Sequence, residues 1–556
     1  MQTARRLYLY LLSAISLGVL SSGVWLVLHV LFDTLGIGQG TPIGGSGTDR
    51  EQLSLALALI GVGLPVWGAH WWLAERGLRP AATHQDEERG STIRALYLSV
   101  VLAVTFALGA FAAIQLIREL ILTIFGGSSP SFFGNDVAGS LALLLVAAIA
   151  WAYHVTVRRR DMSAGALSGA AAWLPRLYLY GVALVALQLM LTGIAGLVEV
   201  IAQAVSPRPD LIDDGSQVYV LADRAAAVIV FGIAWLGHWW YAGRLTADPG
   251  WRGSSERAAR LRLGYFVAVI LISAAAVVER LAEAFRAVLV PVFGATQSIG
   301  FEVTGSDLAR EVAVSLLAAV VWAIAWWLHL RWMRREALQQ DDGGKSVSAE
   351  RLQLHVVAAV GIAFGAVGLA WLLGIVIDVL LGGTRTAAAD GLWRAELATF
   401  VPYAVLGSAV WLWKWSGAIK RSATDPQGEA GSIVRRTYLL IALAASVIAG
   451  IGSLGLILYR LFGSLLGVSL SGNPVSELST PIGILAVAIA VAAYHGVAQR
   501  RDAALRAALP QEATVPQAAP ATGRRLILSG PLDANLDQAI TGLRATLPPG
   551  YRLEES

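Results

Sequence analysis

The chain has 556 residues, of which 56% are hydrophobic and 14% are charged, and its formal net charge is +4. A soluble domain carries about 25% charged residues, so this composition predicts a polytopic membrane protein. The sequence contains no cysteine, which excludes disulfides, thiolate metal sites, iron–sulfur clusters and cysteine nucleophiles.

Apolar segments follow one another along the chain as six helical hairpins, each with a long first helix and a shorter second helix. About 20 apolar residues suffice to span a bilayer, and each segment reaches that length. We therefore expect an all-α integral membrane fold with twelve transmembrane helices. The segments begin near Leu7 and Gln52, Leu96 and Val137, Leu177 and Val220, Leu263 and Leu308, Leu352 and Ala395, and Thr437 and Thr480.

The positive residues indicate an orientation. About three quarters of the 42 Lys and Arg residues lie in the N-terminus, the loops between hairpins or the C-terminal tail, and positive residues are retained on the cytoplasmic side. We expect a multi-pass protein of the bacterial plasma (inner) membrane with a cytoplasmic N-terminus and a cytoplasmic C-terminus. Arg residues beside spans are typical of contact with anionic headgroups, so membrane lipids are the expected partners and nucleic acid is not.

An internal repeat runs through the apolar region. An offset of 168 residues relates the first third of this region to the second, and an offset of 174 relates two Arg residues of the second third to the last. We expect three parallel four-helix repeats at residues 1–165, 166–345 and 346–506, arranged either around a pseudo-threefold axis or in an open row. The matches include Trp67 and Trp235, His70 and His238, Arg94 and Arg262, Arg118 and Arg286, then Arg262 and Arg436, and Arg286 and Arg460.

The same five letters begin two of these repeats. Residues 6–10 read RLYLY, and residues 176–180 read RLYLY again, so the first helix is a retained structural unit rather than a cleaved signal peptide. With its aromatic and His end, the thrice-repeated unit resembles an uncharacterised bacterial family of multi-pass membrane proteins classed as a domain of unknown function. The resemblance covers roughly residues 5–501 and implies no activity, cofactor or catalytic residue.

Trp and His residues gather where the second helix of a hairpin reaches the expected inner side. One interpretation is anchoring, because indole rings prefer the headgroup level of the bilayer. The alternative is that the His residues ligate a haem or a metal, although Lys414 replaces the sixth of them and we expect no cofactor. The residues concerned are Trp67, Trp235 and Trp411, and His70, His154, His238, His329 and His495.

Ionisable residues within or near spans are functional candidates by default. Arg118, Arg286 and Arg460 each lie about 36 Å along a helix from the Arg that starts it, which predicts a repeated outer-interface contact to carboxylates or lipid phosphates. Glu279 and Glu283 lie deeper on one helical face. They are candidates for a conduction pathway or for structural pairing, for example with the neighbouring Arg280.

The end of the chain differs in composition from the spans. Residues 507–523 form an Ala- and Pro-rich linker. Residues 524–556 suggest a small strand–helix–strand unit, which is too short to bury a core of its own. We expect this tail to dock on its own membrane domain, on a second protomer of a homo-oligomer or on a partner of a membrane complex.

No catalytic motif appears in the sequence. Gly343-Gly344-Lys345-Ser346 ends like a phosphate-binding loop, but it lacks the required first glycine and follows a membrane helix. Gly361 and Gly365 indicate close helix packing. We therefore expect a non-catalytic scaffold, assembly or lipid-organising component rather than an enzyme. The alternatives are a channel or transporter for a small solute or ion, and a haem- or hydrophobic-cofactor-binding protein.

Overall fold

The computed structural model describes residues 2–37, 46–78, 85–126, 137–163, 169–205, 214–295, 305–339, 343–384, 392–466 and 473–507. These residues form 15 α-helices and no strand, as expected for an all-α fold. Three helices are short, namely α3 (Gln85–Arg89), α8 (Trp251–Arg257) and α13 (Pro426–Gly431). The linker and the predicted strand–helix–strand tail lie outside the described residues, apart from Ala507.

The other helices are long. They are α1 (Gln2–Thr34), α2 (Ser46–Arg76), α4 (Thr92–Phe125), α5 (Val137–Ser163), α6 (Gly169–Val205), α7 (Asp214–Thr246), α9 (Arg260–Val292), α10 (Gly305–Gln339), α11 (Gly343–Leu380), α12 (Leu392–Thr424), α14 (Ile433–Leu465) and α15 (Pro474–Ala507). The expectation of a shorter second helix fails in two hairpins, because α10 has 35 residues against 33 in α9, and α15 has 34 against 33 in α14.

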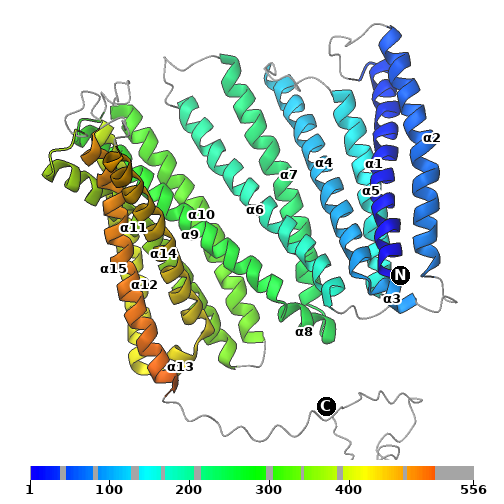
Figure 1. The fold of residues 1–556 in the computed structure, drawn as a ribbon. Coiled ribbons are helices and arrows are strands. Elements are labelled where there is room, and N and C mark those ends of the chain that lie inside the picture. Colours follow the sequence, from blue (N-terminus) through cyan, green and yellow to red (C-terminus); the bar gives the residue numbers. More distant parts are fainter. Residues whose placement is uncertain are drawn as a thin grey trace, which may run out of the picture. The chain divides into compact units, whose positions relative to one another are not determined.

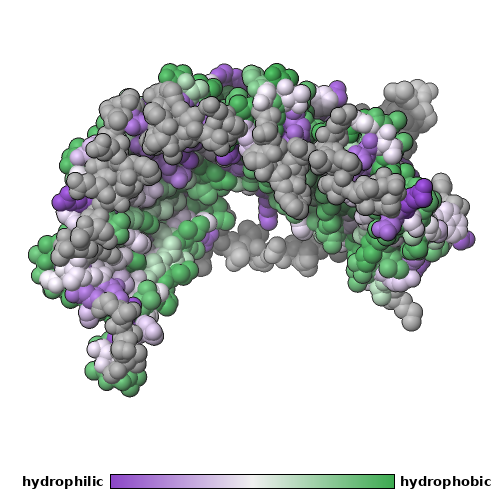
Figure 2. Space-filling view, turned by 90° about the horizontal axis from the view of Figure 1, so that it is seen from above, coloured by the Kyte–Doolittle hydropathy of each residue, from purple (hydrophilic) through white to green (hydrophobic). Residues whose placement is uncertain are grey.

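Within the described residues, 12 helices are long and apolar enough to cross a membrane. Large aliphatic and aromatic side chains remain exposed along these helices, and hydrophobic residues dominate their flanks when viewed along the helix axes (Figure 2). In water this surface would be costly, whereas lipid tails cover it without penalty. The protein is thus a multi-pass helical membrane protein, as its composition predicts.

The long helices pack in three groups that follow chain order (Figure 1). The first helix group is α1, α2, α4 and α5, in which α1 contacts the other three and α4 contacts α5. The second group is α6, α7, α9 and α10, and α6 plays the part of α1. The third group is α11, α12, α14 and α15, in which α11 contacts α12 and α14.

Neighbouring groups meet through one recurring combination of helices. The third long helix of the first group, α4, contacts α6 and α7 of the second group. Likewise α9, the third long helix of the second group, contacts α11 and α12. At both junctions, the third long helix of one group therefore contacts the first and second long helices of the next group.

Small residues bring paired helices together, as the Gly361 and Gly365 pattern indicates. A Cβ atom on Gly361 would lie 2.5 Å from the backbone nitrogen of Trp411, and one on Gly365 would lie 2.9 Å from that of Ser408. A side chain at either glycine would push α11 away from α12. Pro65 and Pro402 lie inside α2 and α12, and each of these helices continues through its proline.

The helix α1 begins at one end of the bundle. We call that end of the long helices the N-terminal side. The short helices α3, α8 and α13 all lie on that side (Figure 1). Each connects the first hairpin of its group to the second and carries a carboxylate toward the bundle. These connections position the polar clusters described next.

Candidate functional site

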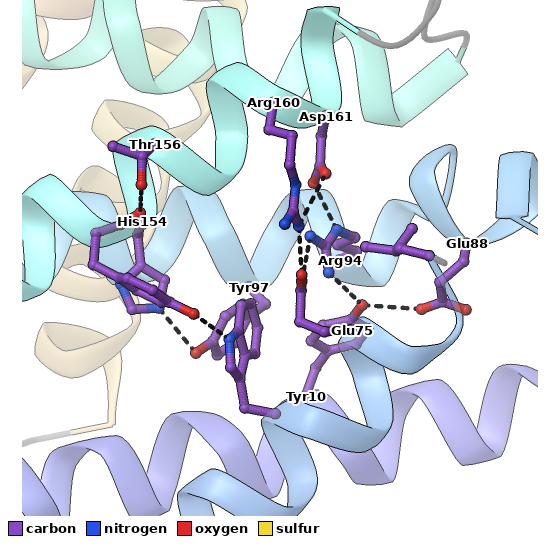
Figure 3. Close-up of polar contacts among 12 residues, drawn as sticks. Tyr10, Glu75, Glu88, Arg94, Tyr97, His154, Thr156, Arg160 and Asp161 are labelled. Carbon is purple, nitrogen blue, oxygen red and sulfur yellow. Dashed lines mark hydrogen bonds and ion pairs between the residues drawn. The ribbon is translucent and has the colours of Figure 1, made fainter. Parts of the chain in front are cut away.

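Arg94, near the start of α4, is the centre of a polar cluster in the first helix group (Figure 3). Its side chain is only 1% exposed. The Nε atom donates to Asp161 of α5 at 2.7 Å, Nη2 donates to Glu75 of α2 at 2.8 Å, and Nη1 donates to the Tyr10 hydroxyl of α1 at 3.1 Å. One guanidinium therefore connects all four long helices of the group.

The same cluster reaches the short helix α3. The Tyr10 hydroxyl donates to Glu88 at 2.9 Å, and Arg6 Nε donates to the other oxygen of Glu88 at 2.7 Å. Arg6 and Tyr10 are one helical turn apart, so both face α3 from a single side of α1. The first and last residues of RLYLY are this Arg and this Tyr. Their contact with the short helix was not predicted, although the repetition of the five letters marked them as important.

A Tyr–His pair adjoins the Arg94 cluster. His154 Nδ1 lies 2.7 Å from the Ala150 carbonyl, and His154 Nε2 lies 3.1 Å from the Tyr97 hydroxyl (Figure 3). Because a carbonyl only accepts, Nδ1 carries the proton and Nε2 of the neutral ring accepts from tyrosine. Trp71 packs against both rings, with centroids 5.3 Å from Tyr97 and 5.8 Å from His154.

The second group repeats this arrangement on its own residues. Arg262 Nε donates to Glu336 at 2.7 Å, and its Nη1 donates to the Tyr180 hydroxyl at 2.9 Å. Tyr180 in turn donates to Glu256 of α8 at 2.7 Å. The Tyr265 hydroxyl lies 3.0 Å from His329 Nε2, which completes the second Tyr–His pair.

The third group centres on Arg435, which corrects the expected match of Arg262 to Arg436. Arg435 Nε donates to Asp502 at 2.7 Å and is buried, whereas Arg436 is exposed. The true offset is therefore 173 residues (262 to 435). The Tyr438 hydroxyl lies 3.1 Å from His495 Nε2 at the same offset from Tyr265.

The third cluster lacks one link that the other two have. His355 stands where Tyr10 and Tyr180 stand, one turn after an Arg that binds the short-helix carboxylate, here Arg351 to Glu429 at 2.7 Å. His355 Nε2, one oxygen of Glu429 and Arg435 Nη1 are all buried without a hydrogen-bond partner. In the other groups, a tyrosine hydroxyl at the position of His355 is hydrogen-bonded to both the equivalent arginine and the equivalent glutamate.

His355 also lines a cavity. This cavity has a volume of about 790 Å³ and lies among α9, α11, α14 and α15. Aliphatic side chains such as Ile362, Val367 and Ile441 make up most of its wall, and Tyr438 contributes with His355 to its polar part. The wall of this cavity is thus mostly apolar.

The five His residues expected as alternative ligands share one geometry and are not brought together. Each Nδ1 donates to the carbonyl four residues earlier, at 2.7–2.9 Å. Each Nε2 lies 3.0–3.4 Å from a tyrosine hydroxyl. Coordination through Nε2 would require that tyrosine to move, and the described residues contain no group of three or more metal-ligating side chains. The residues are His70, His154, His238, His329 and His495.

The tryptophans divide into two kinds. Trp235 and Trp411 point inward, where their Nε1 atoms donate to the hydroxyls of Tyr265 and Tyr438 at 3.1 and 3.0 Å. Trp67 is half-buried and stacks on Trp71. The exposed tryptophans, which suit the anchoring interpretation, are Trp72, Trp173, Trp240, Trp327 and Trp413. At the sixth position, Lys414 lies over the Trp413 ring.

The repeated outer Arg residues make ion pairs. Arg460 lies 2.6 Å from Glu477 of α15, and Arg286 lies 3.9 Å from Glu311 of α10. Arg118 pairs with the adjacent Glu119 at 3.3 Å, and its Nη1 also donates across the group junction to the Tyr219 hydroxyl of α7 at 3.3 Å. All three residues lie toward the ends of their helices opposite the N-terminal side.

The two deep carboxylates behave differently from each other. Arg280 pairs with Glu283 at 2.7 Å, one helical turn away. Glu279 forms no hydrogen bond or ion pair within the described part of the chain and is half-buried. The structure therefore brings only Glu283 into the pairing that was an alternative to a conduction pathway.

The chain matches one known family three times. The family described as a domain of unknown function (DUF5671) matches residues 6–131, 176–305 and 351–514. Each match begins at the Arg that binds the short-helix carboxylate of one helix group. No curated protein and no solved structure matches the chain.

Proposed function

We propose that this chain, which belongs to the DUF5671 family, is a non-catalytic membrane scaffold of three four-helix repeats that assembles with further copies of itself. The proposed contact is the junction that its own helix groups make. The observation that carries the proposal is that, within the described residues, α2 and α14 each leave one half of this junction uncovered.

The uncovered half at the start of the chain lies on α2. Ala222 of α7 and Ala398 of α12 are 0% exposed, and Ala398 packs against Val290 of the preceding group. The equivalent residue of α2 is Ser54, by the same offsets that relate Trp67, Trp235 and Trp411, and it is exposed. One turn later, Ala58 is exposed whereas its equivalents Ala226 and Pro402 are buried.

The uncovered half at the other end lies on α14. Ala274 and Val278 of α9 are buried against α11 and α12. Their equivalents in α14 are Val447 and Ile451, which are 52% and 67% exposed. Ala110, the corresponding residue of α4, is buried at the junction with the second group. In the part of the chain that the structure describes, the face that α4 and α9 use for the next group is thus exposed on α14.

A second copy of the chain suits both faces. Its α1 and α2 would meet α14 as α11 and α12 meet α9. Such a contact joins unlike surfaces, so it generates a ring if the rotation closes and an open chain if it does not. Because lipid tails are as apolar as these side chains, small residues such as Ser54 and Ala58 favour association by allowing close helix packing.

The polar clusters support a structural rather than a catalytic role. Arg94, Arg262 and Arg435 each form an ion pair with a carboxylate of their own helix group. Buried groups of this kind fix one arrangement of helices because any other arrangement leaves a charge unpaired. The proposal also includes an inner-membrane location with both termini cytoplasmic, supported by the distribution of Lys and Arg.

Cysteine cross-linking tests the assembly, because the natural chain has no cysteine. Residues 54 and 463 are the equivalents of Ala398 and Val290, which pack together. Ser54→Cys and Gly463→Cys chains, coexpressed and oxidised in membranes, should form a cross-linked dimer. Leu461→Cys is the matched control, since it lies at the same depth on another side of α14. Equal cross-linking by the control, or a single copy by mass photometry, would contradict the proposal.

A further inference from the structure

A cavity of about 280 Å³ lies on the N-terminal side, where the end of α5 meets α6, α7 and α8. Four arginines from three helices line it, together with two serines that carry hydroxyl groups. The arginines are Arg158, Arg159, Arg176 and Arg252, and the serines are Ser163 and Ser255. This cavity belongs to the junction between the first and second helix groups and to none of the Tyr–His pairs.

Arg158 is the unusual member of this set. It is 8% exposed, and its Nη1 atom is buried without a hydrogen-bond partner. Its guanidinium lies over the Tyr178 ring, 4.8 Å from the centroid, which holds the side chain in place without neutralising it. A buried guanidinium without a carboxylate is costly, so this position favours an anion in the cavity.

The carboxylate that lines the cavity is already used. Glu256 accepts from Arg176 Nε at 2.8 Å through one oxygen and from the Tyr180 hydroxyl at 2.7 Å through the other. Arg176 also donates to Ser255 at 3.2 Å, which leaves the Ser255 hydroxyl proton free to donate into the cavity. Arg158 and Arg159 also line the cavity, and neither pairs with a carboxylate within the described residues.

The junction between the second and third groups provides an internal comparison. There Met333 replaces Arg158, Asp425 replaces Arg252 and Gly428 replaces Ser255. Asp425 lies 3.2 Å from Arg351, the equivalent of Arg176. The equivalent of Arg159 is Arg334, which donates to Gln353 at 2.9 Å. That junction has no excess of positive charge, so the positive cavity is a property of one place and not of the repeat.

We propose that this cavity binds a phosphate group, which belongs either to an anionic phospholipid headgroup or to free inorganic phosphate. Guanidinium groups present forked N–H donors that match phosphate oxygens. Arg158 would approach the phosphate from the protein interior, while Arg159 and Arg252 approach from the exposed rim and Ser255 donates through its hydroxyl. The proposal does not depend on self-assembly.

Binding measurements on the full-length detergent-solubilised protein test this site and separate the two sources. Native mass spectrometry would count phosphatidylglycerol and phosphatidylcholine adducts, and calorimetric titration would use inorganic phosphate. The test variant is Arg158→Met, which copies Met333. The control is Arg331→Met, because Arg331 is an exposed arginine of α10 on the same side of the protein. Loss of one charge-assisted contact should weaken binding about tenfold.

Each outcome decides the proposal. Loss of phosphatidylglycerol adducts in Arg158→Met but not in the control supports a lipid headgroup, and loss of phosphate binding alone supports the free anion. Equal binding by the natural chain and both variants would overturn the site. Should Arg158→Met fail to fold, the Arg159→Gln change carries the same test, because Arg159 is exposed and lines the same cavity.

Discussion

Arg435 Nε lies 2.7 Å from an oxygen of Asp502, yet its Nη1 atom has no partner because His355 stands where the second group has Tyr180. In that second group, the Tyr180 hydroxyl both accepts from Arg262 and donates to Glu256. The third cluster thus keeps the ion pair and loses the bridge. This difference leads to the first prediction.

His355→Tyr should stabilise the third group. The new hydroxyl would give partners to Glu429 and Arg435, each of which has a buried unpartnered atom. Leaving such a group unsatisfied costs about 1–3 kcal/mol, so we expect a higher midpoint of thermal unfolding in detergent. Tyr180→His is the reverse change and should lower it. A lower midpoint for His355→Tyr would show that the adjacent cavity does not admit a tyrosine in this orientation.

Arg94→Gln should be strongly destabilising. The side chains of Arg94 and Asp161 are 1% and 6% exposed, and removing one partner leaves an unpaired buried charge, which costs about 3–5 kcal/mol. Arg421→Gln is the control, because its pair with Glu350 lies at helix ends on the N-terminal side and is 33% and 53% exposed, and exposed pairs contribute about 0–1 kcal/mol. Denaturant titration followed by tryptophan fluorescence compares the two. Equal effects would remove Arg94 from its central role.

Gly365→Leu should separate α11 from α12. Its Cβ would lie 2.9 Å from the Ser408 backbone nitrogen, so the two helices must shift, at a cost of about 1–3 kcal/mol. Gly452→Leu in α14 provides the control, since nothing lies within 4 Å of a Cβ built there. Thermal unfolding in detergent measures both. An unchanged midpoint for Gly365→Leu would contradict the close approach of these helices.

His329→Gln tests the haem or metal alternative. His329 is 1% exposed and uses both ring nitrogens in hydrogen bonds. We expect the variant to lose stability while the absorbance spectrum and metal content of the purified protein stay unchanged. Tyr265→Phe removes the hydrogen-bond donor but keeps the imidazole, so it separates the two roles. A Soret band or bound metal that disappears in His329→Gln and persists in Tyr265→Phe would restore the ligand interpretation.

The sequence was sufficient to predict the spans, because their length and apolar composition are imposed by the bilayer. It also placed Arg94 and Arg262 in register. It failed at Arg435, since Arg435 and Arg436 are adjacent and of the same residue type. Only the partner Asp502, 67 residues later, distinguishes them. Trp235 and Trp411 were interpreted as anchors at the headgroup level, and the sequence did not reveal that their indole nitrogens donate to buried tyrosines.

The residues of the polar clusters that were not predicted from the sequence were missed for one common reason. Tyr10 and Glu88 lie in different helices and 78 residues apart, and no local periodicity connects them. The repeated RLYLY letters marked the tyrosine as important but did not reveal its partner. The cavity between the first two groups was hidden for a similar reason, because its arginines come from α5, α6 and α8.

The order in which the clusters close has a consequence for biosynthesis. During translation, Arg94 enters the membrane after Tyr10 and Glu75 but before Asp161, with which it makes its most buried pair. The polar cluster of the first group is therefore complete once Asp161 has been synthesised. The clusters of the second and third groups are complete once Glu336 and Asp502 have been synthesised. Since domains fold as units during synthesis, a stop between these points would leave an arginine without its most buried carboxylate partner.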